Sequence, residues 1–398
     1  LTLYDQRPSK EVQGQFLHQR ISLEFVDPIR VVAWPEPDGG HEIMVVIHHV
    51  AADGVLAGEM FNEFFDPRAD RPSLGEDSSM SSAVNANDLG DLDWWTSRLK
   101  ELLGEDGLPM SDLRSGADSE QFYTATDDAS LKAAMEHAAR EQPYGRVTYG
   151  LAAWALVIAH RLGRDQVVIG VPFAMDSKQG LSANMLPIIA KIGGQTVGGL
   201  LDSISVQIAD AIEHRCASLG SIAAAMSGDK HHLRPPVDAV LTVDDLVRDL
   251  GDGVVIQWQP TQSSSFQASA VVPQASSIFG IEVEGGFLDG EAPESMLQRW
   301  MYVIEKIVGL GSSVGTEVRA DSIDVLLPSM LAELAAFGEP EKVHDSGQSA
   351  LQRFDLMLAD HHDDVAVIDD SGSITYAELD AWSRCIAGRL MDQGVKAG

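Results

Sequence analysis

The chain has 398 residues, enough for two or three folded domains, and its 44% apolar and 22% charged residues are typical of a globular protein. Sixty acidic against 28 basic side chains give a formal net charge of −32 at pH 7. Because this charge repels phosphate backbones and anionic lipid headgroups, it excludes nucleic acids and membrane surfaces as main partners.

Cysteine content and apolar patterning predict a cytoplasmic protein. Cys216 and Cys385 are the only cysteines and have no neighbours at metal-ligand spacing, so the sequence offers neither a disulfide framework nor a zinc site. The segment 1–7 has no basic start followed by an apolar stretch, so we expect no signal peptide. The longest apolar run, Tyr149–Ala159, is shorter than the ~20 residues of a membrane span and predicts a buried helix.

The first predicted elements are a hairpin and a helix. Residues 29–34 and 43–47 are rich in β-branched side chains and flank the sequence Pro-Glu-Pro-Asp-Gly-Gly, which is typical of a hairpin turn. The second strand runs directly into His48. After Gly54, apolar residues at helical spacing predict a helix. These residues are Leu56, Met60, Phe64 and Phe65.

A polar connection and a tryptophan-bearing helix come next. Residues 69–92 are rich in Ser, Asp, Asn and Gly and predict a long surface connection. A helix that contains Trp94 and Trp95 is expected to end near Leu103. A second loop is expected around residues 109–118.

The middle of the chain has the pattern of a mixed α/β domain. Helices are predicted over 131–140 and 147–162, followed by a strand over 166–171. The last elements of this domain are a strand over 278–284 and a helix over 293–308.

The end of the chain is set apart by a linker. Residues 336–349 lose apolar periodicity and gain Gly, Pro and Ser. We expect a short helix beyond them, then a strand over 365–368 and a turn over 370–372. A capped helix is predicted to begin near Tyr376.

The segment His48-His49-Val50-Ala51-Ala52-Asp53-Gly54 carries the clearest chemical signal. A histidine at the end of a strand can present one ring nitrogen to a cleft while a neighbour fixes the other nitrogen. Such a residue suits acyl transfer, in which an amine is positioned, loses a proton and attacks a thioester. Asp53 would order the turn, and Gly54 permits close approach. Alternatively, the histidines are satisfied polar groups and Asp53 only caps a helix.

This segment resembles the HHxxxDG motif of the condensation domains of nonribosomal peptide synthetases, which have the chloramphenicol-acetyltransferase-like fold. Residues 93–99 resemble the family's Tyr/Trp-bearing helix, and residues 167–172 resemble its VVxGxPxxxR strand. Residues 184–188 are similar to its VNTLPLR-like segment. Residues 374–380 look like the LTYxEL opening of an adenylation domain, so the chain follows the order of a synthetase module.

The resemblance implies an α/β (α+β) fold of two lobes with a tunnel between them. Upstream donor and downstream acceptor carrier domains would insert phosphopantetheine arms from opposite faces, and the acceptor amine would attack the donor thioester. By position, His49 would be the catalytic histidine, His48 its supporting neighbour, Asp53 a structural ion-pair residue and Gly54 the close-approach position. The chain itself would bind no cofactor and no metal.

The same resemblance predicts four regions. Residues 1–118 would be the remainder of an incomplete first lobe, and residues 119–325 the second lobe. Residues 326–350 would form a linker, and residues 351–398 would begin an adenylation domain. We expect that this adenylation piece does not activate an amino acid, because it has no Gly/Ser/Thr-rich phosphate loop.

The chain also departs from the family pattern. Only 47 residues precede His48, and the segment that supplies the arginine partner of the motif aspartate has no counterpart. The upstream arginines are Arg7, Arg20 and Arg30, and none is assigned to Asp53 by the sequence.

Later motifs are reduced. The HQDVPF-like motif survives only as His214–Ser218, and no RDxSRNPL-like motif is recognised. The stretch Met175–Lys178 stands where the family has an arginine soon after Pro172.

Other polar clusters predict no site. His231-His232 and His361-His362-Asp363-Asp364 lack the spaced ligands of a metal site and are expected to be solvated. Ser263–Ser265 is expected to be structural or to line the tunnel, and the helix with Trp154 to be core. Two alternatives to condensation stay open, an epimerisation domain and a non-catalytic platform that docks carrier proteins or another enzyme.

Overall fold

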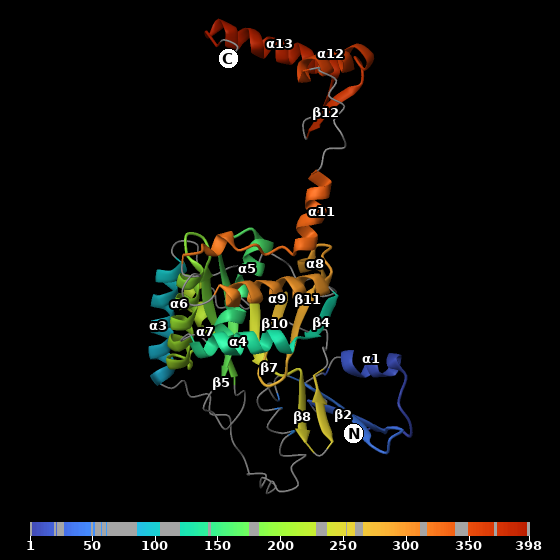
Figure 1. Cartoon of the computed structure of the whole chain (residues 1–398), viewed down its shortest axis with the longest axis vertical. Helices are drawn as coiled ribbons and strands as arrows, with labels where there is room; N and C mark the ends of the chain where they lie inside the picture. The colour runs from blue at the N-terminus through green and yellow to red at the C-terminus, as the bar shows by residue number, and fades with distance from the viewer. Residues whose placement is uncertain are drawn as a thin grey trace. The chain divides into compact units, whose positions relative to one another are not determined.

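The computed structural model describes residues 2–19, 21, 28–48, 51, 57, 61, 86–103, 120–141, 145–174, 183–227, 237–251, 253–258, 266–310, 317–338, 349–369 and 372–395. The chain divides into two compact units, Leu1–Leu327 and Pro328–Gly398 (Figure 1). Within the described residues, no helix has the length and apolar character needed to cross a membrane.

A three-stranded sheet opens the first unit. Its strands are β1 (Thr2–Leu3), β2 (Ile29–Pro35) and β3 (His41–Ile47), in the order β1-β2-β3. The antiparallel pairing of β2 with β3 confirms the predicted hairpin. Alternate residues of β2 face inward, and Trp34 is only 1% exposed, as the pleat of a half-buried strand requires.

Helix α1 (Lys10–His18) was not predicted, because its sequence is mostly polar. Ser9 caps it by accepting a hydrogen bond from the backbone N–H of Val12. The guanidinium of Arg30, on β2, donates to the carbonyl oxygens of Phe16 and Gln19 and lies 5.3 Å from the centre of the Phe16 ring. A residue distant in sequence therefore holds this helix against the hairpin.

A six-stranded mixed sheet forms the centre of the first unit. It contains β4 (Gln121–Asp127), β5 (Gln166–Ala174), β6 (Ala183–Lys191), β7 (Ala239–Asp244), β10 (Ala268–Pro273) and β11 (Ile278–Glu284). The strand order is β4-β11-β10-β7-β5-β6. Strand β7 is parallel to both its neighbours, and the other pairs are antiparallel. The mixed α/β class expected from the sequence is confirmed.

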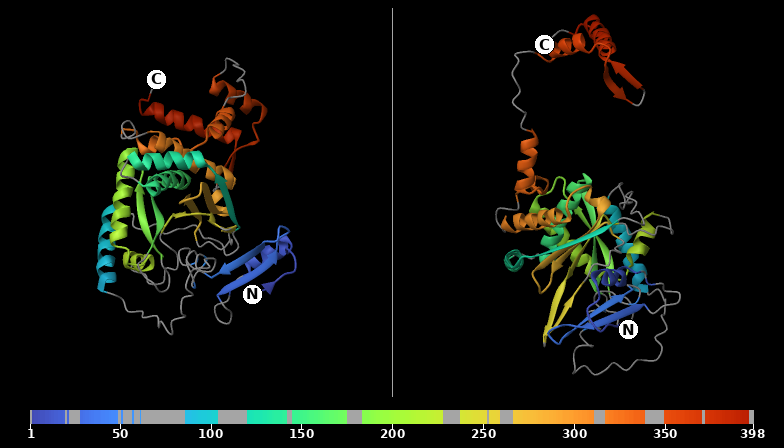
Figure 2. Two further views of the ribbon diagram at one scale, coloured as in Figure 1. Left: turned by 60° about the horizontal axis from the view of Figure 1, so that its bottom comes forward. Right: turned by 90° about the vertical axis from the view of Figure 1, so that its right-hand side faces the viewer.

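Helices α4 (Ala129–Glu141), α5 (Arg146–Leu162) and α9 (Pro293–Gly309) lie together on one face of this sheet (Figure 2). Every residue of α5 from Thr148 to Ala159 is buried, which confirms the predicted buried helix. The indoles of Trp154 and Trp300 meet edge to face at 5.6 Å, and Phe279 of β11 meets Trp300 in the same way. Trp154 is therefore a core residue, as expected.

Gly150 allows α5 to lie close to the sheet. A Cβ atom built at this position would stand 2.5 Å from Cγ2 of Val272, on β10. The indole N–H of Trp300 donates to the carbonyl oxygen of Gly150 at 3.0 Å. The missing side chain thus permits both the close approach and this contact.

Helix α6 (Val197–Glu213) covers the edge strand β6. The side-chain amide of Gln207 accepts from the backbone N–H of Ile189 at 2.9 Å and donates to its carbonyl oxygen at 2.8 Å. An open strand edge can pair with other chains because its backbone groups are unsatisfied. Here the Gln207 amide satisfies the backbone N–H and carbonyl oxygen of Ile189, as a neighbouring strand would.

Helix α3 (Ala86–Leu103) begins within the range predicted as a surface connection. It ends at Leu103, as expected. Its buried residues Trp95, Leu99 and Leu103 recur every fourth position and face the core. The expectation of a loop up to residue 92 was wrong, because burial of this stripe and tertiary contacts of Asp91 outweigh the polar composition.

Smaller elements complete the first unit. Helix α7 (Leu219–Ser227), strands β8 (Val247–Gly251) and β9 (Val254–Gln257), helix α8 (Gly285–Leu288) and the turn η1 (Ala320–Ser322) connect the larger ones. Strands β8 and β9 form a separate antiparallel pair.

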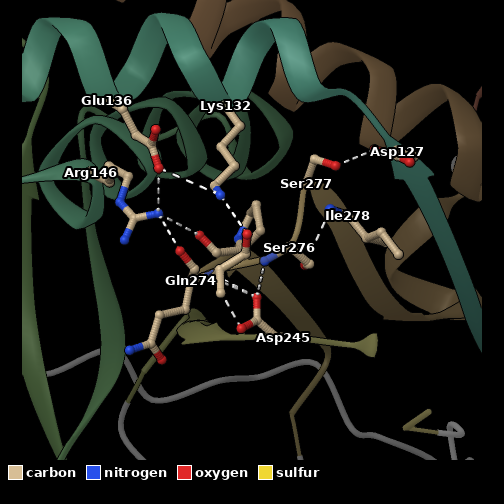
Figure 3. A network of polar contacts seen from close by, with 11 residues as sticks. Asp127, Lys132, Glu136, Arg146, Asp245, Gln274, Ser276, Ser277 and Ile278 are labelled. Atoms are coloured by element: carbon tan, nitrogen blue, oxygen red, sulfur yellow. Dashed lines mark hydrogen bonds and ion pairs between the residues drawn. The ribbon is translucent and has the colours of Figure 1, made fainter. Parts of the chain in front are cut away.

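Asp245, directly after β7, organises the turn between β10 and β11 (Figure 3). Its carboxylate accepts the backbone N–H groups of Gln274, Ala275 and Ser276 at 2.7–3.0 Å. Burial alone raises the pKa of Asp245, but these hydrogen bonds outweigh it and hold the pKa below its ordinary value. From the other side, Arg146 donates to the carbonyl oxygen of Gln274, so the turn is held by two distant elements.

The second unit consists of α11 (Pro328–Gly338), α12 (Ala350–Asp360), β12 (Val365–Asp369), β13 (Gly372–Thr375) and α13 (Tyr376–Asp392). Helix α13 begins at Tyr376, as predicted. Thr375 and Glu378 form a capping box at its start, and Ser349 and Gln352 do the same for α12. Helix α11 lies within residues 326–350, where we expected a linker.

Candidate functional site

His48 stands at the end of β3. Its backbone N–H donates to the carbonyl oxygen of Pro28 at 2.8 Å, which extends the hairpin ladder by one step. The backbone N–H of Ala51 donates to the carbonyl oxygen of His48 at 2.8 Å, so the chain turns directly after it. The side chain of His48 is half-buried. A histidine at a strand end, followed by a turn, is the arrangement that the sequence predicts.

Three candidate residues of the motif, His49, Asp53 and Gly54, lie outside the described residues. Their roles therefore remain predictions. Of the helix expected after Gly54, Ala57 and Phe61 are described and are helical.

The upstream arginines were weighed as partners of Asp53. Arg7 forms an ion pair with Glu42, with Nη2 and Oε2 3.2 Å apart. Arg30 donates to carbonyl oxygens at the end of α1, and Arg20 lies outside the described residues. Both described arginines thus have other contacts, and the partner of Asp53 stays unassigned.

A second cluster joins helix α3 to the end of α6. The carboxylate of Asp91 contacts Nδ1 of His214 at 3.1 Å and accepts the backbone N–H of Cys216 at 2.9 Å. The indole N–H of Trp95 donates to the carbonyl oxygen of His214 at 2.7 Å. The neighbouring Trp94 stacks on the imidazole of His214.

Asn184, at the beginning of β6, completes this cluster. Its side-chain N–H groups donate to the carbonyl oxygens of Arg215 and Ala217 at 2.8 and 2.7 Å. We call Asp91, Trp94, Trp95, Asn184 and His214 the α3–α6 junction.

The α3–α6 junction brings together three segments that were singled out separately in the sequence: 93–99, 184–188 and 214–218. Sequence reasoning missed Asp91, because residues up to 92 were expected to be a loop. The available signal was the spacing of Asp91, Trp94 and Trp95, which places all three on one side of a helix. The junction fixes the turn after α6 against β6.

The paired histidines of the second unit are exposed and contact neighbouring carboxylates. Nδ1 of His361 lies 2.7 Å from Asp364, and Nδ1 of His362 lies 2.8 Å from Asp363. In the described part of the chain, no group of three or more His, Cys, Asp or Glu side chains could hold a metal ion. His231, His232 and Ser263–Ser265 lie outside the described residues.

Comparison with curated proteins gives relatives in one class. No family model matches the chain. A component of the plipastatin synthase of Bacillus subtilis is 22% identical over 97% of this chain. The probable non-canonical nonribosomal peptide synthetase CymA of Salinispora arenicola is 26% identical over 94% of it. The chain spans only 12% and 5% of the lengths of these two proteins.

Solved structures show which fold the chain adopts. The condensation domain of the monacolin K polyketide synthase MokA matches with a TM-score of 0.63 and 14% identity, over 80% of each chain. The X-domain from teicoplanin biosynthesis, solved in complex with OxyB, matches 82% of this chain and 79% of that one, with a TM-score of 0.59 and 16% identity.

A four-domain nonribosomal peptide synthetase bound to AMP and glycine matches all of this chain and 33% of its own length, with a TM-score of 0.66 and 16% identity. The match to a multidomain protein thus includes the second unit. The chain is therefore similar in sequence to nonribosomal peptide synthetases, and it has the fold of condensation domains.

Proposed function

We propose that this chain forms an amide bond between two carrier-bound substrates, as a condensation domain does. The observation that supports this most is the joint presence of the condensation fold, sequence similarity to synthetases over nearly the whole chain, and His48 at the end of β3. The donor would be an acyl or peptidyl thioester on an upstream carrier domain. The acceptor would be an aminoacyl group on a downstream carrier domain.

In the proposed reaction, the acceptor amine attacks the donor thioester carbonyl. The new C–N bond forms as the C–S bond breaks, the amine loses a proton, and the departing thiolate of the donor arm takes one up. His49 would position the amine and transfer this proton. His48 would support His49, Asp53 would hold the turn in an ion pair, and Gly54 would leave room for the substrates.

The phosphopantetheine arms in this proposal belong to the carrier domains. They would deliver the thioesters, and the chain's own residues would orient the two reacting groups and exclude water. The proposed place of action is the cytoplasm, a reducing compartment that suits a chain with two widely separated cysteines.

For the second unit, we propose that residues 351–398 begin an adenylation domain, after a linker over 326–350. Neither α12 nor α13 has a buried residue. On α13, the apolar side chains of Trp382, Ile386 and Leu390 recur every fourth position and are 62%, 57% and 44% exposed. Because a soluble domain covers such a stripe, we propose that the rest of an adenylation domain packs on it.

A non-catalytic docking platform is the second candidate. The observation that favours it is the match to the X-domain, a protein of the same fold solved in complex with OxyB. An epimerisation domain is less well supported, because residues 374–380 resemble the start of an adenylation domain directly downstream.

A reconstituted reaction separates these functions. The chain is incubated with a donor-loaded and an acceptor-loaded carrier protein, and the acceptor carrier is analysed by intact-mass spectrometry. Condensation predicts an acceptor mass raised by the donor acyl group. Binding of both carriers without this mass change would favour the docking platform, and inversion at the donor α-carbon without transfer would favour epimerisation.

A further inference from the structure

Strand β4 forms one edge of the six-stranded sheet, and among the described residues β11 is its one strand partner (Figure 1). Two hydrogen bonds show which backbone groups face β11. The N–H of Asp128 donates to the carbonyl oxygen of Ser277 at 2.9 Å, and the N–H of Gly285 donates to that of Glu120 at 2.8 Å. Because hydrogen-bonded residues alternate along an antiparallel strand, the even-numbered residues of β4 bond to β11.

The backbone groups of Tyr123, Ala125 and Asp127 therefore point away from β11. Within the part of the chain that the structure describes, their N–H and carbonyl groups form no hydrogen bonds. Ala125 and Asp127 are exposed, and Tyr123 is half-buried. These three residues thus offer backbone donors and acceptors to a further strand.

The residues of β4 do not protect this edge. Natural sheets protect an open edge with lysine, proline, a bulge or a covering element. Residues 121–126 carry neither charge nor proline and include two aromatic residues and two threonines, which favour strands. Their pairing with β11 is regular, without a bulge. The opposite edge strand, β6, differs, because it contains Pro187 and its Ile189 is satisfied by Gln207. The composition of β4 therefore favours pairing with another strand.

The surroundings of the β4 edge are acidic. Asp127 lies on the edge itself and accepts a hydrogen bond from the hydroxyl of Ser277 (Figure 3). Glu120 and Asp128 lie directly before and after β4, and neither β4 nor β11 contains a Lys or Arg. Among the described residues, no cation pairs with these three carboxylates, and Lys132 of α4 pairs with a glutamate of its own helix. A strand that adds here should therefore carry positive charge.

The two faces of β4 favour different side chains in an added strand. Thr126 and Thr124 lie directly opposite Phe279 and Ile281, which are buried in the helical core, so both threonines lie on the helical face. Asp127 lies on the other face. Basic residues opposite Asp127 and its face, alternating with β-branched residues beside the threonines, would match both faces, because such cross-strand pairs stabilise a sheet.

We propose that the edge of β4 binds an extended segment of another protein, in which Lys or Arg alternates with β-branched residues. The segment adds to the sheet as an antiparallel strand and exchanges backbone hydrogen bonds with Tyr123, Ala125 and Asp127. A second copy of this chain is not favoured as the partner, because each copy brings a net charge of −32. This docking site does not depend on whether the chain forms amides.

The test uses the whole chain at pH 7 and the end-capped peptide Thr-Lys-Thr-Lys-Thr-Lys-Thr, with hydrogen exchange followed at individual backbone amides by NMR. In the chain alone, the amides of Tyr123, Ala125 and Asp127 should exchange fast, and those of Thr124 and Thr126 slowly. Saturating peptide should slow the three edge amides about tenfold or more, because exchange then requires the added strand to open. Absence of this protection would overturn the proposal. So would edge amides that are already protected in the chain alone, because the edge would then be covered.

Two matched peptides separate strand pairing from attraction by net charge. The same peptide with every backbone N–H methylated keeps the lysine charges but cannot donate backbone hydrogen bonds, so it should not protect the edge amides. The peptide with Glu in place of every Lys keeps the strand pattern but reverses the charge, so it should bind much more weakly. Equal protection by the methylated peptide would refute an added strand, and equal binding of the acidic peptide would refute a basic partner.

Ala125→Pro tests the edge on the protein itself. The N–H of Ala125 points away from β11, so proline removes a donor from the edge without breaking a β4–β11 hydrogen bond. We expect peptide affinity to fall about tenfold or more, with a melting temperature close to that of the wild type. Ala125→Val keeps the N–H and should bind like the wild type, whereas Thr126→Pro removes a bond to β11 and should lower the melting temperature. Wild-type peptide affinity in folded Ala125→Pro would overturn the proposal.

Discussion

The imidazole of His214 lies flat against the indole of Trp94, with ring centres 4.1 Å apart and planes 17° apart. The two residues are 120 positions apart in the sequence, and the same imidazole contacts Asp91. This stacking joins helix α3 to the end of α6.

Loss of the Trp94–His214 stacking should destabilise the first unit. We expect a coupling energy of about 0.5–1.5 kcal/mol between Trp94→Ala and His214→Ala, the usual range for an aromatic pair. Urea unfolding of the two single variants and the double variant measures it. Trp382→Ala, at an exposed position of α13, is the matched control and should leave the first unit unchanged. Strict additivity of the two changes would mean that the stacking contributes nothing.

Gly150→Ala should destabilise the chain by about 1–3 kcal/mol, the usual cost of overpacking a core. The new methyl group would stand 2.5 Å from Val272, which outweighs the gain in helix propensity of about 0.5–1 kcal/mol. Thermal or urea unfolding measures the loss.

The chain offers two controls for this change. Gly145→Ala has no atom within 4 Å of its new Cβ and should be tolerated. Val272→Ala should restore part of the stability lost by Gly150→Ala, because it removes the clashing methyl groups. Failure of this rescue would place the cause outside the contact between α5 and β10.

Asp245→Asn should lower stability at pH 7 by about 1–3 kcal/mol, since a buried carboxylate that accepts three backbone N–H groups is lost. Because the pKa of Asp245 is lowered on folding, its stabilisation is present above the unfolded pKa of about 3.9 and disappears as the pH falls through the folded value. The difference in unfolding free energy between the wild type and Asp245→Asn should therefore shrink as the pH falls.

Urea unfolding at a series of pH values from neutral to acidic measures this gap. Asp249→Asn, at an exposed position of β8, serves as the control and should change the stability only slightly. A gap for Asp245→Asn that stays constant down to acidic pH would contradict the proposed role of its ionised form.

Added salt should raise the melting temperature of the whole chain. The excess acidic side chains behind the net charge of −32 repel one another in the folded state. Salt screens this repulsion beyond a Debye length of about 10 Å at 0.1 M. Calorimetry in sodium chloride and in sodium perchlorate at equal ionic strength separates screening from other ion effects. A melting temperature that falls in both salts would show that favourable ion pairs outweigh the repulsion.

Short sequence patterns predicted the helices and strands whose formation depends on residues within or directly beside the element. The β-branched runs around Pro35–Gly40 gave the β2–β3 hairpin, and the uninterrupted apolar run of α5 gave a buried helix. The capped helix predicted to begin near Tyr376 is α13, and the structure shows that Thr375 and Glu378 cap its start.

The helices and contacts that were not predicted depend on residues that are far apart in the sequence. The polar helix α1 is held by Arg30, and α3 extends upstream to Ala86, where Asp91 reaches His214. The hydrogen bond between Gln207 and Ile189 at the edge of β6 likewise depends on helix α6, which packs on that strand. No periodicity or capping rule within a short window contains such contacts, so the α3–α6 junction emerged only from the fold.

The proposal that His49 takes part in amide formation is tested most directly by His49→Ala. The rate of transfer from a loaded donor carrier to a loaded acceptor carrier is compared for wild type, His49→Ala and His41→Ala, an exposed histidine change on β3. A positioned acid–base group supplies about 10²–10⁴-fold in rate, so His49→Ala should lose at least about 100-fold while His41→Ala keeps the wild-type rate. Transfer by His49→Ala within about threefold of the wild type would contradict the account.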